Sequence, residues 1–256
     1  MVRIAVLYIE AVDFRQLTFL RPALLAVQRV SDRLGFQLIY SRVTGIPEAE
    51  LYRPMFQPWR SSAWMAKLNL GDDRSLLTPE ARYYFYSLAA DAKTTSAGSA
   101  AECGVYRGGT AKILSGLFSD RELLLFDTFE GMPETDPDKD LHRKGDFADT
   151  SLESVKAYVG APESVKFVAG FIPETLAPFS DRTFCFVHVD LDIYASIRSA
   201  CDFFYPRLGA GGIMLFDDYG FASCPGARRA VDEFFNDKTE TPMVLPTGQC
   251  FVRRNR

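Results

Sequence analysis

Short apolar runs alternate with amphipathic stretches along most of the chain from about residue 78. The stretches between the runs are long enough for helices, a pattern typical of a parallel sheet with helical crossovers. The sequence therefore predicts an α/β fold with a doubly wound, mostly parallel sheet that closes with an antiparallel hairpin. The expected strands are residues 100–104, 122–127, 165–169, 184–190 and 212–217, with 243–245 and 249–253 as the hairpin.

Residues 1–77 do not continue this pattern. Two strand-like runs, VRIAVLYI and FQLIYSRV, flank a helix-like stretch and precede the aromatic and proline-rich segment LYRPMFQPW. We predict that residues 1–77 form an N-terminal extension that serves as a substrate lid or a subunit contact. Residues 78–256 are then the α/β domain.

Composition excludes several classes of protein. The chain of 256 residues is 47% hydrophobic and 24% charged, as in ordinary globular proteins. A net charge of -4 gives no electrostatic reason to expect nucleic acid or a membrane surface as partner. The first apolar run is too short for a signal peptide or a membrane span. The five cysteines show no zinc-type spacing, so we expect reduced thiols in a cytoplasmic protein.

A glycine-rich turn follows the first predicted strand of the α/β domain. Glycines at 104, 108 and 109 let the backbone turn tightly and approach a ligand where a helix begins. The turn is not the dinucleotide fingerprint, because Tyr106 stands where that motif needs glycine, and it lacks the lysine of a phosphate-binding loop. A nucleotide-type turn and a plain strand-to-helix connection both remain open.

Acidic residues end the first two strands of this domain. Asp127 follows Glu102 by about 25 residues, near the spacing at which an acid accepts hydrogen bonds from ribose hydroxyls. Glu102 would lie deeper, where its carboxylate could face a cofactor's amino group or positive charge. The pair favours a nucleoside cofactor, although Asp127 alone would also serve as a turn or helix cap.

Three further carboxylates follow the fourth and fifth strands. Asp190 ends one strand, and Asp217 and Asp218 end the next. If these strands are neighbours, the acids converge, and a hard divalent cation such as Mg²⁺ would relieve their repulsion. We expect Asp192 to be a helix cap and His188 to orient Asp190 or to be a hydrogen-bonded core residue.

The polar, turn-rich stretch at residues 128–150, here called the lid segment, is long for a structureless loop in a compact domain. Such loops are usually functional or mobile, so we interpret it as a lid, with a solvated surface insertion as the alternative. It contains His142, which is an auxiliary base or a solvent-exposed loop histidine.

Taken together, these motifs resemble the macrocin O-methyltransferase (TylF-like) family. The segments that carry the resemblance are AECGVYRGGT, LFDTFEGMPETDPDKDLHRKGDFADTSLESVK, GFIPETL, HVDLDIYASI and GGIMLFDDYG, within about residues 78–253. The resemblance implies a class I methyltransferase (Rossmann-like) fold, S-adenosylmethionine as methyl donor and a magnesium site. Members methylate sugar hydroxyls or phenols in natural-product and antibiotic biosynthesis, and they commonly self-associate, which implies a homo-oligomer.

The resemblance also assigns roles to residues. The metal ligands fall on Asp190, Asp217 and Asp218, and the catalytic base falls on Asp190, with His142 as an auxiliary base in the lid segment. The implied cofactor contacts are Glu102, Gly104, Tyr106, Arg107, Asp127, Thr128, Phe129, Gly170 and Phe171.

The function that follows is magnesium-dependent transfer of a methyl group from S-adenosylmethionine to a hydroxyl of a small sugar, such as a nucleotide-deoxysugar or a glycoside. The main alternative is a metal-dependent glycosyltransferase, because Asp190 and Asp192 mimic the paired acids that bind a nucleotide-sugar diphosphate. That alternative leaves the glycine turn unexplained. A nicotinamide-dependent sugar dehydrogenase and a non-enzymatic sugar-binding module rank lower.

Overall fold

The computed structural model describes residues 57–68, 73–160 and 162–255. The chain divides into two compact units, Met1–Lys67 and Leu68–Arg256. In the first unit the described residues form η4 (Pro58–Arg60) and α3 (Ser62–Lys67). The strand-like runs expected near the N-terminus and most of the segment LYRPMFQPW lie outside the described residues. The predicted boundary at residue 77 therefore stays a prediction.

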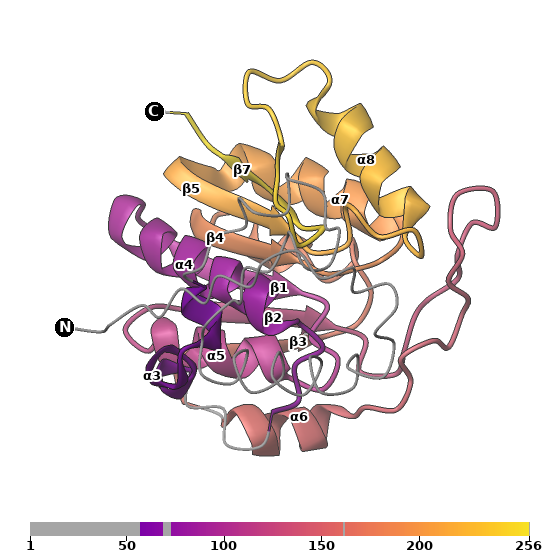
Figure 1. The fold of residues 1–256 in the computed structure, drawn as a ribbon. Helices are drawn as coiled ribbons and strands as arrows, with labels where there is room; N and C mark the ends of the chain where they lie inside the picture. Colours follow the sequence, from indigo (N-terminus) through magenta and orange to yellow (C-terminus); the bar gives the residue numbers. More distant parts are fainter. Residues whose placement is uncertain (1–56, 69–72, 161, 256) are drawn as a thin grey trace, which may run out of the picture. The chain divides into compact units, whose positions relative to one another are not determined.

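The second unit is built on a seven-stranded sheet with the order β3-β2-β1-β4-β5-β7-β6 (Figure 1). Strands β1 to β5 are parallel, and β7 pairs antiparallel with both β5 and β6. The bounds are β1 Ser99–Cys103, β2 Leu123–Asp127, β3 Val165–Ala169, β4 Phe184–Val189, β5 Leu208–Phe216, β6 Met243–Val244 and β7 Cys250–Arg253. The predicted α/β class, with its closing hairpin, is confirmed.

One strand begins more than one residue away from its predicted start. Strand β5 begins at Leu208, four residues before the predicted start at residue 212. The reason is the sequence LGAGG, which lacks the large apolar side chains by which a strand is recognised. The sheet accommodates these glycines with a register shift, since Leu208 pairs with Phe184 whereas Ile213 pairs with Phe186.

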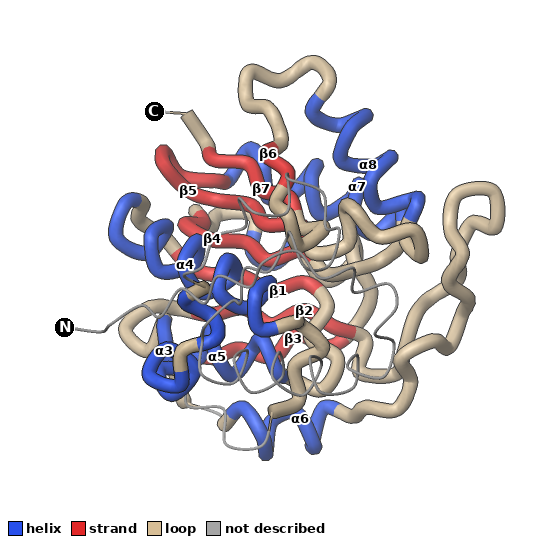
Figure 2. Tube along the Cα trace, in the orientation of Figure 1, coloured by secondary structure: helices blue, strands red, loops and turns tan. Residues whose placement is uncertain are grey.

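Helices cover both faces of the sheet (Figures 1 and 2). One row consists of α4 (Pro79–Thr95), α5 (Gly109–Leu117) and α6 (Leu152–Val159), and α7 (Tyr194–Phe204) packs against α8 (Pro225–Phe235). Phe85 of α4 packs edge-on against Phe186 of β4, whereas the next residue, Val187, joins the core formed with α7 and α8. This alternation follows from the two-residue period of a strand, and it makes the sheet apolar on both faces.

Local signals set where these helices begin. Thr78 caps α4, because its hydroxyl oxygen accepts a hydrogen bond from the backbone N–H of Ala81, and Pro79 follows as the first helical residue. Ser151 caps α6 in the same way. Two 3-10 turns, η5 (Ala177–Phe179) and η6 (Tyr205–Arg207), precede β4 and β5. No described helix combines the length and the apolar character needed to cross a membrane.

The strand order reverses direction between β1 and β4, the neighbouring strands at the centre of the sheet. In open parallel sheets, ligands bind beyond the carboxyl ends of the strands at such a reversal. The topology therefore directs attention to the residues that follow β1, β2, β4 and β5.

Candidate functional site

A cavity of about 390 Å³ lies beyond the carboxyl ends of these strands. Most of the residues predicted for the site line it: Gly104, Tyr106, Arg107, Asp127, Thr128, Gly170, Phe171, Asp190, Asp217 and Asp218. Glu102, Phe129 and His142 do not. Glu102 and Phe129 are buried behind the cavity wall, and His142 lies on the lid segment. Leu76 and Phe221 add exposed apolar side chains to the lining.

The glycine turn is held against the end of β4. Gly104 has a φ of 87°, and a Cβ atom at this position would lie 1.6 Å from the backbone carbonyl oxygen of Asp190. No other residue fits there, because a side chain would meet backbone rather than a movable group. Tyr106 also has a positive φ, of 50°, so the turn is strained where it faces the cavity.

Asp127 braces this turn from the neighbouring strand. Its Oδ2 accepts hydrogen bonds from the backbone N–H groups of Val105 at 2.6 Å and Tyr106 at 2.9 Å. Its Oδ1 accepts a third, from the N–H of Phe129, at 2.6 Å. The side chain therefore acts as a turn cap and also lines the cavity, and its role toward a ribose stays a prediction.

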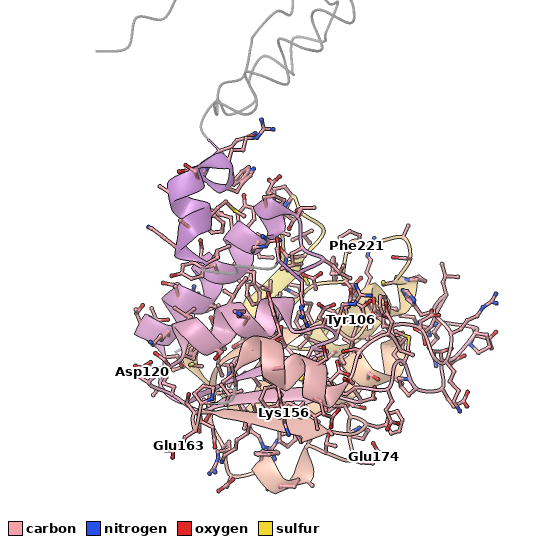
Figure 3. All side chains as sticks on the ribbon, turned by 90° about the horizontal axis from the view of Figure 1, so that it is seen from below. Tyr106, Asp120, Lys156, Glu163, Glu174 and Phe221 are labelled. Atoms are coloured by element: carbon pink, nitrogen blue, oxygen red, sulfur yellow. The ribbon has the colours of Figure 1, made fainter. Side chains whose placement is uncertain are left out.

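The lid segment is ordered by hydrogen bonds of its own and by contacts with the glycine turn. The backbone N–H of Met132 donates to the carbonyl oxygen of Asp146 at 2.8 Å. The Tyr106 hydroxyl donates to Asp149 at 2.6 Å, and Arg107 forms an ion pair with the same carboxylate. The C-terminal part of the lid segment is thus fastened to the turn that borders the cavity (Figure 3 labels Tyr106).

Three carboxylates meet at the ends of β4 and β5. Asp190, Asp192 and Asp218 each place an oxygen so that all three atoms lie within 4.8 Å of one another. Burial, followed by the charges of Asp217 and Asp218, raises the pKa of Asp190 well above its ordinary value. Burial and the charges of Asp192 and Asp217 do the same to the pKa of Asp218. These carboxylates therefore bind a proton or a cation more readily than isolated carboxylates do.

Asp217 lies beside this cluster but has other partners. Its Oδ1 accepts a hydrogen bond from Nε2 of Gln249 at 2.7 Å, and Nε2 of His188 lies 3.7 Å away. The structure thus brings Asp190 and Asp218 together as predicted, and it adds Asp192. The assignment of Asp217 as a ligand stays a prediction.

Asp192 is not a helix cap, so that interpretation is wrong. The N-cap of α7 is Ile193, and the backbone N–H of Tyr194 donates instead to Oδ1 of Asp140, in the lid segment, at 2.8 Å. Asp192 has a positive φ of 59°. Its Oδ1 lies 3.6 Å from Nε2 of His142. The lid segment therefore returns to the acidic cluster.

A pair of buried ionisable side chains, His188 and Glu102, lies next to the site. Nδ1 of His188 lies 2.9 Å from Oε1 of Glu102, and both side chains are fully buried. Burial alone would lower the pKa of His188, but the neighbouring carboxylates of Asp217 and Glu102 outweigh it and raise this pKa to about 9. His188 is therefore a hydrogen-bonded core residue that joins β4 to β1.

The sequence model of the macrocin O-methyltransferase (TylF) family matches residues 88–247, which contain every predicted site residue. The chain belongs to this family. One relative in it, the demethyldecarbamoylnovobiocin O-methyltransferase of Streptomyces niveus, is 30% identical over 54% of the chain and 58% of its own length. Another, the mycinamicin III 3''-O-methyltransferase of Micromonospora griseorubida, is 28% identical over 54% of the chain and 60% of its own length.

The matches with these macrocin O-methyltransferase relatives thus span less than two thirds of each relative's length. Among solved structures, the O-methyltransferase NovP superposes with a TM-score of 0.63 at 26% identity, covering 75% of this chain and 88% of its own. The calicheamicin methyltransferase CalS11 superposes with a TM-score of 0.58 at 19% identity, over 91% of this chain and 93% of its own, and shows the shared fold. Family membership favours the methyltransferase interpretation over the glycosyltransferase alternative.

Sequence reasoning missed two polar residues of this site. Asp192 carried a signal, since it stands two residues after Asp190, but the expected helix obscured it. Gln249 carried none, because it belongs to the hairpin and reaches Asp217 only through the antiparallel pairing of β7 with β5.

Proposed function

We propose that the protein is an S-adenosylmethionine-dependent O-methyltransferase that acts on a hydroxyl of a sugar or a sugar-bearing natural product. The proposal rests on one observation in a chain of this family: two features of different chemistry border the same cavity. A glycine turn braced by Asp127 and a buried carboxylate cluster border one cavity. The first suits a nucleoside cofactor, and the second suits an acceptor that must lose a proton.

The donor side of the cavity is the glycine turn and the ends of β2 and β3. We assign cofactor contacts to Gly104, Tyr106, Arg107, Asp127, Thr128, Gly170 and Phe171, which line the cavity, and to Glu102 and Phe129, which support its wall. Negative charge from the buried acids would favour the positively charged sulfonium. Phe171, at 48% exposed, offers an apolar surface on which a flat base would pack.

The acceptor side is the carboxylate cluster, and its chemistry fits a hard cation. All its ligand atoms are carboxylate oxygens, Asp218 is buried and Asp190 and Asp192 are half-buried, so uncompensated charge would be costly. We assign Mg²⁺ to Asp190, Asp217 and Asp218, with Asp192 as the nearest further oxygen donor. When bound, the ion supplies positive charge that lowers the pKa of an acceptor hydroxyl as a Lewis acid.

Methyl transfer is an in-line displacement in which the new O–C bond forms as the C–S bond breaks, so alignment of the acceptor contributes much of the rate. The acceptor hydroxyl must give up its proton as it attacks. Asp190 is the proposed base, because it lines the cavity on the acceptor side. His142 is the proposed auxiliary base, since its Nε2 faces Asp192 at the cluster's edge.

The acceptor class rests on the relatives, one of which is named as the 4'-O-methyltransferase of a dimethoxy-rhamnosyl tetracenomycin. We propose a neutral glycoside or a nucleotide-deoxysugar, a homo-oligomeric assembly and a cytoplasmic location. All five cysteines are free thiols, which is consistent with the location.

Calorimetric titration with S-adenosylhomocysteine, with and without Mg²⁺, tests the donor proposal, with NAD⁺ and a nucleotide-sugar as controls. Binding of S-adenosylhomocysteine alone among these ligands would support it. Binding of only the nucleotide-sugar would overturn it in favour of glycosyl transfer.

A further inference from the structure

Three chemically different side chains converge beside the carboxylate cluster. His142 comes from the lid segment, Asp192 follows β4, and Cys224 is the N-cap of α8. The Cys224 sulfur lies 3.7 Å from Nε2 of His142 and 3.4 Å from Oδ1 of Asp192. The third separation, between His142 Nε2 and Asp192 Oδ1, is 3.6 Å. One imidazole, one carboxylate and one thiol thus form a triangle.

The size of this triangle matches one face of a tetrahedral zinc site. Bond lengths of about 2.0–2.1 Å to nitrogen, 2.0–2.2 Å to oxygen and 2.3 Å to sulfur place tetrahedral ligand atoms about 3.4–3.6 Å apart. The observed separations of 3.4, 3.6 and 3.7 Å fall on or within about 0.1 Å of that range. The ligand atoms would need almost no movement to receive an ion.

The histidine is already oriented for this role. Nδ1 of His142 lies 3.0 Å from Oδ2 of Asp146, which also accepts a hydrogen bond from the backbone N–H of Arg143. A carboxylate on one imidazole nitrogen fixes the tautomer that leaves the other nitrogen free to bind a metal. Phe147 packs against the ring, with centroids 5.5 Å apart. These contacts aim Nε2 at Cys224 and Asp192.

We propose that His142, Asp192 and Cys224 bind a borderline-soft divalent cation of the zinc class next to the proposed magnesium site, with Asp192 common to both clusters. His142 would then be a metal ligand in place of an auxiliary base. Thiolate and imidazole ligands select such ions, whereas a site made only of carboxylates selects hard cations. Asp192 lines the cavity, so the ion has a route from solvent. Because His142 belongs to the lid segment, the ion would tie that segment to α8 and to the end of β4.

Metal binding by the full-length protein tests the proposal without reference to methyl transfer. After chelator treatment, the protein is titrated with Zn²⁺ and, separately, with Co²⁺ in the presence of excess Mg²⁺. We expect one ion per chain and, for Co²⁺, a thiolate-to-cobalt charge-transfer band. Cys224→Ser should abolish that band, and His142→Ala should weaken Zn²⁺ binding at least about tenfold. Cys201→Ala, which removes a thiol buried in α7, should leave both unchanged.

Limited digestion with trypsin adds a readout on the lid segment. Arg143 and Lys144 are exposed beside His142, so bound Zn²⁺ should slow cleavage there in the natural protein and not in the His142→Ala variant. The proposal is overturned if Zn²⁺ does not bind, or if excess Mg²⁺ displaces it. It is also overturned if binding is equal in the natural protein and in both ligand variants. His142→Ala lies on a surface loop, which keeps the test valid even if Cys224→Ser fails to fold.

Discussion

Nδ1 of His188 and Oε1 of Glu102 lie 2.9 Å apart beneath the cavity, and neither side chain reaches solvent. The pair joins β4 to its neighbour β1 at the centre of the sheet. Each residue keeps one polar atom, Nε2 of His188 and Oε2 of Glu102, without a hydrogen bond among the described residues. Stability at this position therefore depends on the charge balance of the pair rather than on complete hydrogen bonding.

Replacement of either His188 or Glu102 should show that stability depends on the charge balance of this pair. His188→Leu should lower the free energy of unfolding by about 3–5 kcal/mol, because it leaves the carboxylate of Glu102 buried without a countercharge. Glu102→Leu in the same background should restore part of the loss. Urea unfolding of both single variants and the double variant measures the coupling, and strictly additive losses would contradict it.

The Asp127 brace predicts a specific loss of cofactor binding. Asp127→Asn replaces one acceptor oxygen with an amide that faces backbone N–H donors, so we expect at least a roughly tenfold weaker affinity for S-adenosylhomocysteine and a loss of about 2 kcal/mol in stability. Calorimetry and urea unfolding measure the two effects. Asp120→Asn is the matched control, since Asp120 is on the surface away from the cavity (Figure 3). Equal effects in the two variants would contradict the inference that Asp127 holds the glycine turn in place for the cofactor.

The glycine turn gives a prediction on folding. Gly104→Ala should destabilise the protein by more than about 3 kcal/mol or prevent folding, because the new Cβ would meet a backbone oxygen at a positive φ. Gly116→Ala is the opposite case: Gly116 lies in α5 with open space around it. That variant should gain about 0.5–1 kcal/mol from better helix propensity. Thermal unfolding of the two variants checks the contrast.

The carboxylate cluster gives a prediction on catalysis. Asp190→Asn and Asp218→Asn should reduce methyl transfer at least about a hundredfold while leaving the affinity for S-adenosylhomocysteine within about threefold, since they act on the acceptor side. Comparison of Asp217→Asn with Asp192→Asn then identifies the third ligand by its effect on the Mg²⁺ dependence of the rate. An equal loss of turnover and donor binding in Asp217→Asn would count against its assignment.

Glu240 gives a prediction on acid stability. Burial raises the pKa of Glu240, but hydrogen bonds from the Tyr205 hydroxyl, the Asn255 backbone and the Thr239 hydroxyl outweigh burial and lower this pKa to about 2. Because the folded-state value lies below the ordinary 4.5, the carboxylate stabilises the fold above about pH 4.5, and this contribution is lost as the pH falls towards 2.

Glu240→Gln should therefore lower the thermal midpoint at neutral pH, and the difference from the natural protein should shrink as the pH falls below about 4.5. Glu163→Gln, at an exposed glutamate, is the control and should follow the natural protein throughout (Figure 3). A constant difference across the pH range would show that the charge of Glu240 is not the cause.

The sequence predicted most of the fold because short apolar runs and turn residues mark buried parallel strands directly. Prediction was incomplete at β5, because Gly209 and Gly211 interrupt the apolar run by which a strand is recognised. In the site, residues that directly follow strands were found, among them Gly104, Asp190 and Asp218. Residues placed by a backbone turn or by distant segments were not. The positive φ of Asp192 is a backbone conformation that the sequence does not signal, and no spacing rule relates Cys224 to His142.

The hydrogen bond from the Tyr194 backbone N–H to Asp140 couples the lid segment to the start of α7. The lid segment thus satisfies the first backbone N–H of α7 from outside the helix, although the N-cap residue is Ile193. A capping interaction contributes about 1 kcal/mol, which corresponds to roughly a fivefold population ratio. Withdrawal of the segment would fray the helix end next to Asp192, and rigidity at the acidic cluster would then depend on whether the cavity is closed.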